Sequence, residues 1–278
     1  MNNKGTGRAD RALLLAVLIL LMGFAGGCAH RLHVPMQPDG WSVQPIVISC
    51  RFAPDADLDP ATGTPMGDEG YYLYIMAEPA HWDFSEAASL LFSIWWRPRA
   101  HGWIMLESPQ NSLEFGHIGN FGREQPRYHE GVVQRSRAGD PNPISYLWET
   151  MSDGKFQVGK PIRPPTFVWR MPITRQRHQR IYEYVMQRKY DRFGVNTNNC
   201  TDFVAEVAAL AGINLMHRIR LTLPPEAKFL GRPLRVWTDP QYRVLEFSTP
   251  EVLEVDLRQL AQIGIGSDVT GWYLDLKQ

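Results

Sequence analysis

The chain has 278 residues and carries 29 Lys and Arg residues against 29 Asp and Glu residues, so its formal net charge is zero. A balanced charge excludes the strongly basic surface typical of nucleic-acid-binding proteins. Hydrophobic residues make up 44% of the chain and aromatic residues 11%, which excludes a largely disordered protein. We therefore expect a folded domain that does not bind nucleic acid.

The N-terminus has three parts: basic residues, the apolar run 12–22, and a group of small residues that ends at Cys28. The run is shorter than the roughly 20 apolar residues that a transmembrane helix needs, so it predicts a signal peptide over residues 1–27. Small residues ending directly on a cysteine resemble the lipobox of bacterial lipoproteins, in which that cysteine is acylated and becomes the mature N-terminus. The alternative is an ordinary cleaved signal, with Cys28 as a bystander.

After the signal, the composition changes twice along the chain. Residues 28–70 are rich in Pro, Gly and Asp and predict a lipid anchor and tether with one strand at 46–50. We assign residues 71–230 to the main domain. Residues 231–278 predict short strands, ending near Leu274, that complete or cap this domain.

Within the main domain, the first core strand is predicted at residues 71–76, a run of aromatic and aliphatic residues. Asp83 stands three residues before Glu86, a capping-box spacing that predicts an amphipathic helix through about residue 95.

A β-hairpin is predicted next, with strands at 101–107 and 112–118 and a turn between them. His101 and His117 stand near the outer ends of these strands. Because the outer ends of an antiparallel hairpin lie side by side, we expect both histidines at one edge of the sheet. A solvated side chain is the simpler alternative for each of them.

Residues 120–165 are rich in Pro, Gly and Arg and predict a long loop, either a lid over a site or a solvated insertion. A further strand is predicted at 167–170. Thr174 predicts the N-cap of an amphipathic helix that follows it.

A polar loop then leads into an apolar helix at Cys200. Apolar residues recur at helical spacing from Phe203 to Ala211, and Gly212 occupies the position of a left-handed C-cap. Cys200 therefore lies in the first turn, where unpaired backbone N–H groups and the helix dipole favour the reactive thiolate. The pattern predicts Cys200 as a nucleophile.

Two other interpretations of Cys200 are open. If Cys28 is acylated, Cys50 and Cys200 could form a disulfide in an oxidising compartment, and a bonded Cys200 could not act as a nucleophile. His101, His117 and Cys200 could instead supply three zinc ligands, although no closely spaced His or Cys pair supports a metal site.

Two motifs, with His117 between them, resemble those of the circularly permuted papain-like hydrolases: His101-Gly102-Trp103-Ile104-Met105-Leu106 and Asn199-Cys200-Thr201-Asp202-Phe203-Val204. This group is related to the NlpC-type cell-wall peptidases and includes the lecithin:retinol acyltransferase branch. In it the histidine-bearing strand precedes the cysteine-bearing helix. The resemblance implies Cys200 as the nucleophile, His101 as the general base and His117 as the residue that orients His101. It also implies that the backbone N–H of Cys200 contributes to an oxyanion hole.

The resemblance implies an α+β fold, in which a papain-like antiparallel sheet carries the nucleophile-bearing helix. The expected activity is that of a thiol protease or related hydrolase that forms an acyl-enzyme on Cys200 and cleaves amide bonds in peptidoglycan stem peptides. The alternatives are a lipid acyltransferase or phospholipase of the permuted branch, and a non-catalytic lipoprotein that only binds a ligand. The lipobox implies an outer-membrane anchor through Cys28, facing the periplasm. The expected partners are the membrane and the peptidoglycan or lipid substrate, with no metal or other cofactor.

Overall fold

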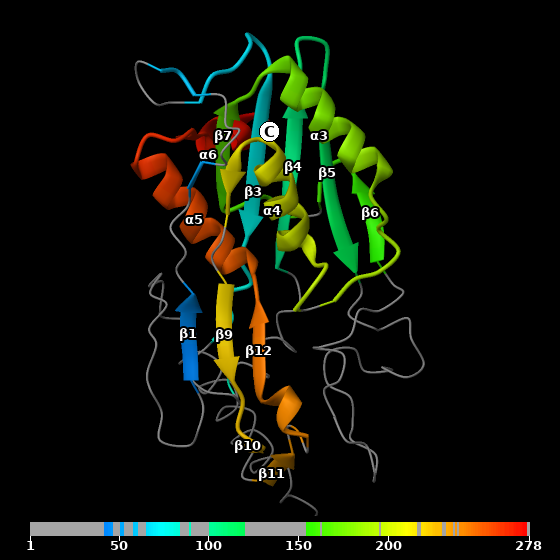
Figure 1. The fold of residues 1–278 in the computed structure, drawn as a ribbon, viewed down its shortest axis with the longest axis vertical. Coiled ribbons are helices and arrows are strands. Elements are labelled where there is room, and N and C mark those ends of the chain that lie inside the picture. Colours follow the sequence, from blue (N-terminus) through cyan, green and yellow to red (C-terminus); the bar gives the residue numbers. More distant parts are fainter. Residues whose placement is uncertain are drawn as a thin grey trace, which may run out of the picture. The chain divides into compact units, whose positions relative to one another are not determined.

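A six-stranded antiparallel β-sheet is the main element of the structure (Figure 1). The computed structural model describes residues 42–46, 51–52, 58–60, 65–83, 89, 100–119, 154–161, 163–194, 196–215, 218–229, 232–235, 237 and 239–276. The strand order of the sheet is β13-β7-β3-β4-β5-β6. The strands are β3 (Tyr72–Glu78), β4 (His101–Glu107), β5 (Ser112–Gly119), β6 (Gly154–Val158), β7 (Phe167–Pro172) and β13 (Ser267–Asp268).

Four α-helices accompany this sheet in the described part of the chain. They are α3 (Arg175–Gln187), α4 (Cys200–Leu210), α5 (Pro250–Gln262) and α6 (Thr270–Asp275). The described fold is therefore α+β, with an antiparallel sheet.

Three smaller sheets complete the described elements. The three-stranded sheet has the order β1-β9-β12, and β2 with β8 and β10 with β11 form two-stranded sheets. The bounds are β1 (Ser42–Ile46), β2 (Arg51–Phe52), β8 (Ile213–Asn214), β9 (Arg218–Thr222), β10 (Glu226–Phe229), β11 (Arg232–Arg235) and β12 (Val244–Phe247), with a 3₁₀ turn at Pro240–Arg243.

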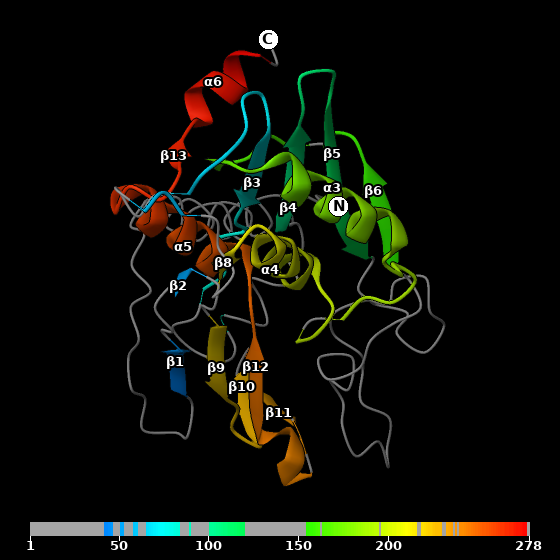
Figure 2. The ribbon, with the colours of Figure 1, turned by 45° about the horizontal axis from the view of Figure 1, so that its top comes forward.

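The two faces of the six-stranded sheet bury different sets of side chains. On one face, Ile104 and Leu106 of β4 pack in one cluster with residues of α3, α4 and α5, including Phe203 of α4. On the other face, Trp103 of β4 packs with Tyr273 of α6. Because side chains alternate along a strand, covering both faces gives β3 and β4 their nearly continuous apolar sequences. Figure 1 shows α4 in front of the sheet, where it packs on β4 and β5, while α5 packs on β3. Figure 2 gives a second view of these elements.

Several predicted elements are confirmed. The core strand near 71–76 is β3, the hairpin is β4 and β5, and the strand at 167–170 is part of β7. Thr174 is the N-cap of α3 and accepts from the N–H of Arg177. Gly212, directly after the C-cap of α4, has a φ of 89°, which suits a residue without a side chain.

The prediction for the C-terminal tail is wrong in one respect. It places only short strands there, whereas α5 and α6 occupy much of this segment. Thr249 caps α5 and Pro250 stands at its start, a helix signature that the strand prediction overlooked. The tail also supplies β13, which pairs with β7 as an edge strand of the main sheet.

Other predictions lie outside the described residues. They include the signal peptide and Cys28, most of the strand at 46–50, nearly all of the helix after Asp83, and residues 120–153 of the predicted lid. The chain divides into two units, Met1–His33 and Val34–Gln278, and the described residues all belong to the second. None of the described helices is long and apolar enough to cross a membrane.

Candidate functional site

Helix α4 begins at Cys200 because the residue before it is a strong cap. The side-chain oxygen of Asn199 accepts from the N–H groups of Thr201 and Asp202 at 2.8 and 3.0 Å. In return, the Asp202 carboxylate accepts from the N–H of Asn199 at 3.1 Å, which completes a capping box. The cap fixes Cys200 in the first turn. Cys200 is a buried free thiol in the described structure, as a nucleophile requires.

Strands β4 and β5 separate at the end that Cys200 approaches. Their ladder ends at the pair Trp103 and Gly116, while β4 stays paired with β3 as far as His101 and β5 stays paired with β6. Gly102 lies in the stretch of β4 that no longer pairs with β5, and its backbone N–H donates to the Cys200 sulfur. The thiol is therefore anchored to the backbone of β4, one residue from His101.

The His101 ring lies on the sheet face opposite α4. It stacks on Trp103, with ring centroids 5.4 Å apart, and Trp103 belongs to the cluster on that opposite face. By contrast, a Cβ added to Gly102 would lie 3.6 Å from the side chain of Val204 on α4. Cys200 and His101 thus approach the end of β4 from its two sides.

Gln157 of β6 holds the His101 ring. Nε2 of His101 lies 2.9 Å from Oε1 of Gln157. The other end of the Gln157 amide donates to the carbonyl of Gly159 at 3.1 Å, which establishes that the oxygen faces His101. Because that oxygen can only accept, Nε2 carries the proton of the neutral imidazole, and Nδ1 carries the lone pair. The ring is held in a tautomer in which Nδ1 can act as a base.

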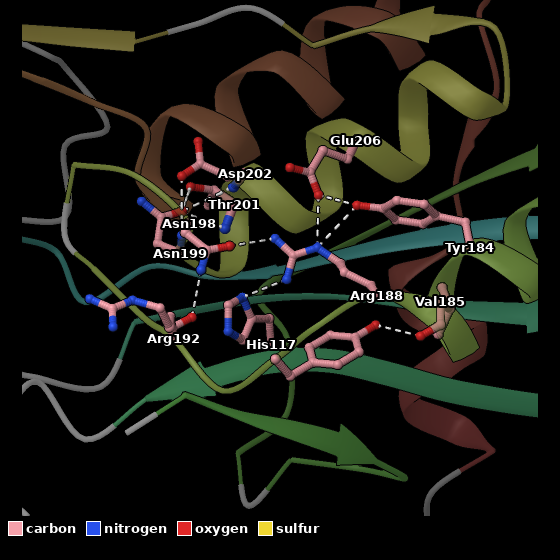
Figure 3. Close-up of polar contacts among 11 residues, drawn as sticks. His117, Tyr184, Val185, Arg188, Arg192, Asn198, Asn199, Thr201, Asp202 and Glu206 are labelled. Carbon is pink, nitrogen blue, oxygen red and sulfur yellow. Dashed lines mark hydrogen bonds and ion pairs between the residues drawn. The ribbon is translucent and has the colours of Figure 1, made fainter. Parts of the chain in front are cut away.

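His117 lies in a different environment from the predicted one. Its ring is fully buried on the face that α4 covers, between two aromatic rings, and its Nδ1 lies 3.1 Å from Nη1 of Arg188 (Figure 3). Among the described residues, no hydrogen bond joins His117 to His101, and none joins Cys200 to either histidine. Gln157, rather than His117, therefore makes the contact that orients His101.

Burial keeps Cys200 and His101 neutral. It raises the pKa of Cys200 to about 12 and lowers the pKa of His101 to about 4, although the bond to Gln157 opposes the second shift. Backbone N–H groups do favour the thiolate, as expected at a helix start, but desolvation outweighs them and the charge of Asp202 adds to it. The expectation of a resting thiolate is corrected accordingly: the proton stays on the sulfur.

Sequence reasoning missed Gln157 as a candidate site residue. Gln157 lies in an edge strand at the end of the segment predicted as a loop, and no short motif marks it. The run Gly154–Val158 could have indicated a strand, but nothing in the sequence pairs that strand with His101.

Comparison with protein-family models, with curated proteins and with solved structures finds no match. What the site can do follows from its residues. In the part of the chain that the structure describes, no group of three or more His, Cys, Asp or Glu side chains could hold a metal ion. His101 and His117 lie on opposite faces of the sheet, so two of the three residues considered as zinc ligands point away from each other.

Proposed function

We propose that this chain is a cysteine hydrolase, with Cys200 as nucleophile and His101 as general base on a papain-like scaffold of permuted order. The observation that carries the proposal is the 2.9 Å contact between His101 and Gln157, because it leaves Nδ1 of a neutral imidazole ready to accept a proton. The Cys200 thiol, held by the N–H of Gly102, lies beside the same strand end. Cys200 and the His101 ring approach this strand end from opposite faces of the sheet, so the proposed proton transfer requires the substrate complex to bring the two groups within hydrogen-bond reach.

The neutral state of both groups favours proton transfer during attack over a preformed ion pair. The Cys200 sulfur attacks the carbonyl carbon of the substrate while its proton passes to Nδ1 of His101. The C–N bond then breaks, and His101 returns the proton to the leaving amine. Water attacks the resulting thioester with His101 again as base, which releases the acid and restores the thiol. The backbone N–H of Cys200 contributes to the oxyanion hole.

The proposed substrate is an amide bond in peptidoglycan stem peptides, and the proposed location is the periplasmic face of the outer membrane. Both rest on the sequence: on the resemblance to the NlpC-type peptidases, and on the lipobox-like residues that end at Cys28. Two or three acyl chains on Cys28 would anchor the protein stably, whereas one chain would not.

Incubation of the purified protein with muropeptides, and separately with phospholipid vesicles, tests the activity. We expect amide cleavage of muropeptides, detected by mass spectrometry, that is lost in Cys200→Ala. The matched control is Cys50→Ala, which removes the other cysteine expected to be unacylated and should retain activity. If only phospholipid gives Cys200-dependent products, the protein is a lipid hydrolase and not a peptidase. If neither substrate gives a Cys200-dependent product, the proposal of an enzyme is overturned in favour of a lipoprotein that only binds a ligand.

The anchor is tested separately from the activity. We expect the wild-type protein in the membrane fraction and Cys28→Ser in the soluble fraction, with an acyl mass on the N-terminal peptide of the wild type only. An unmodified Cys28 in the mature wild-type protein would exclude the lipid anchor.

A further inference from the structure

Arg188 connects three parts of the structure around the start of α4. It is the C-cap of α3, and its side chain is only 8% exposed. The guanidinium spans the region between β5, α4 and the loop before Cys200 (Figure 3). Its contacts are Glu206 Oε2 and Tyr184 OH from Nε at 2.9 and 3.0 Å, His117 Nδ1 from Nη1 at 3.1 Å, and Asn198 Oδ1 from Nη2 at 2.7 Å.

Asn198 is the contact that bears on the nucleophile. It has a φ of 59°, a left-handed conformation that is uncommon for residues other than glycine. Both ends of its amide are anchored, since Oδ1 accepts from Arg188 and Nδ2 donates to the carbonyl of Arg192 at 2.6 Å. Asn198 belongs to residues 196–199, the nucleophile loop, which leads directly into Cys200. Holding this side chain therefore fixes the turn that delivers Cys200 to α4.

His117 and Glu206 fix the guanidinium in turn. A guanidinium can only donate and stays charged, so Nδ1 of His117 must be its unprotonated acceptor. Aromatic rings at centroid distances of 5.3 and 5.2 Å hold the imidazole in place. Glu206 supplies the opposite charge from α4. Contacts from β5 and α4 thus orient the planar guanidinium, and its Nη2 donates to Asn198 of the nucleophile loop.

We propose that Arg188 is a positioning residue, which ties the nucleophile loop to β5 and α4 so that Cys200 stays at the end of β4, against the N–H of Gly102. The effect on turnover rests on the proposed function. A merely stabilising Arg188 would behave differently, because its loss would lower the amount of folded protein without slowing the molecules that remain folded.

The test compares Arg188→Lys, Asn198→Gly and the double variant with wild type. Lysine keeps the charge but cannot reach several acceptors in the geometry of the guanidinium fork, and glycine tolerates the positive φ while removing the anchored amide. Arg180→Lys, on the exposed side of the same helix, is the matched control. We expect each single variant to lower the kcat of the folded protein roughly 10- to 100-fold, as small misplacements do, with KM nearly unchanged and with some loss of melting temperature from the lost hydrogen bonds.

Because both substitutions break the same bond, the double variant should lose no more than the worse single variant. An unchanged kcat in Arg188→Lys, or losses that multiply in the double variant, would overturn the positioning role and leave the proposed function standing. If Arg188→Lys does not fold, the kcat of Asn198→Gly decides by the same criterion.

The proposed function can fail independently of this inference. If wild type shows no Cys200-dependent turnover, the rate of Cys200 alkylation by iodoacetamide, followed on the Cys200 peptide at pH 9, decides instead. A several-fold change in Arg188→Lys but not in Arg180→Lys would support the positioning role. Equal rates in all three proteins would overturn it.

Discussion

Gly116 lies directly beneath the His101 ring: an ideal Cβ on Gly116 would be only 3.0 Å from Nε2 of His101. The same Cβ would lie 3.3 Å from Oε1 of Gln157, which pairs with Gly116 across β5 and β6. The hydrogen bond between His101 of β4 and Gln157 of β6 therefore crosses β5 at Gly116, where β5 has no side chain. A side chain at residue 116 would force the imidazole or the Gln157 amide to shift by a few tenths of an ångström.

We expect Gly116→Ala to lower kcat about tenfold or more, because the methyl group pushes the imidazole away from Gln157. The cost in stability should stay near 1 kcal/mol, since the affected atoms are the ends of side chains that can shift. Steady-state kinetics and urea denaturation measure the two effects.

Gly271→Ala is the matched control for that variant. Its Cβ would have no neighbour within 4 Å, and it lies in α6, where alanine is the better helix former. We expect unchanged kinetics. Full activity in Gly116→Ala would contradict the role assigned to the bond between His101 and Gln157.

Gln157→Glu should change the pH dependence of the reaction. A carboxylate beside Nε2 favours the imidazolium, so the pKa of His101 should rise from about 4 and the acid limb of kcat/KM should move to higher pH. Gln157→Leu, which offers no acceptor, should lower kcat about 10- to 100-fold without moving that limb upward. If the acid limb is the same in Gln157→Glu and wild type, residue 157 does not influence the protonation of the catalytic base.

Cys200→Ser should abolish turnover and leave the fold nearly intact. The serine oxygen can accept from the N–H of Gly102 as the sulfur does, so we expect a stability change of about 1 kcal/mol. Thermal melting and the muropeptide assay measure the two effects. A large loss of stability would instead indicate that Cys200 serves mainly to fill the core.

Stability should fall in acid because His117 is held neutral in the folded protein. Burial, together with the charge of Arg188, lowers its pKa from 6.5 to about 4. Between these values the unfolded chain binds more protons than the folded one, so stability rises with pH over this window and is level above it. The shift of His117 corresponds to about 3 kcal/mol lost as the pH falls from 6.5 to 4.

Urea denaturation of wild type and His117→Asn at several pH values isolates this contribution. Asparagine can still accept from Arg188 but does not titrate. We expect a shallower pH dependence in His117→Asn, whereas parallel curves would show that His117 does not titrate in this window.

Features of the site that depend on neighbouring residues were predictable from the sequence, whereas contacts between residues distant in the chain were not. The helix start at Cys200 was predictable because its signals, the polar cap at Asn199 and the apolar period after it, lie within a few residues. The two histidines were correctly expected at neighbouring strands. The sheet face on which each histidine ring lies was not predictable, because a shift of one residue in the strand register moves a side chain to the other face.

The net protonation of Cys200 also depended on the fold. The backbone N–H groups at the helix start act as expected, but desolvation by residues distant in the sequence is the larger effect. Gln157 and Arg188 are polar residues in unremarkable surroundings, and only tertiary packing brings them to His101 and the nucleophile loop.

The burial of Cys200 also bears on how the protein survives oxidants. Peroxides attack the thiolate, and a thiol whose pKa is raised to about 12 carries almost none of it at neutral pH. A cysteine at a well-hydrated helix start would be oxidised faster. We therefore expect Cys200 to resist sulfenic acid formation, and under the proposed function it becomes nucleophilic only while a substrate carbonyl and His101 are both within reach.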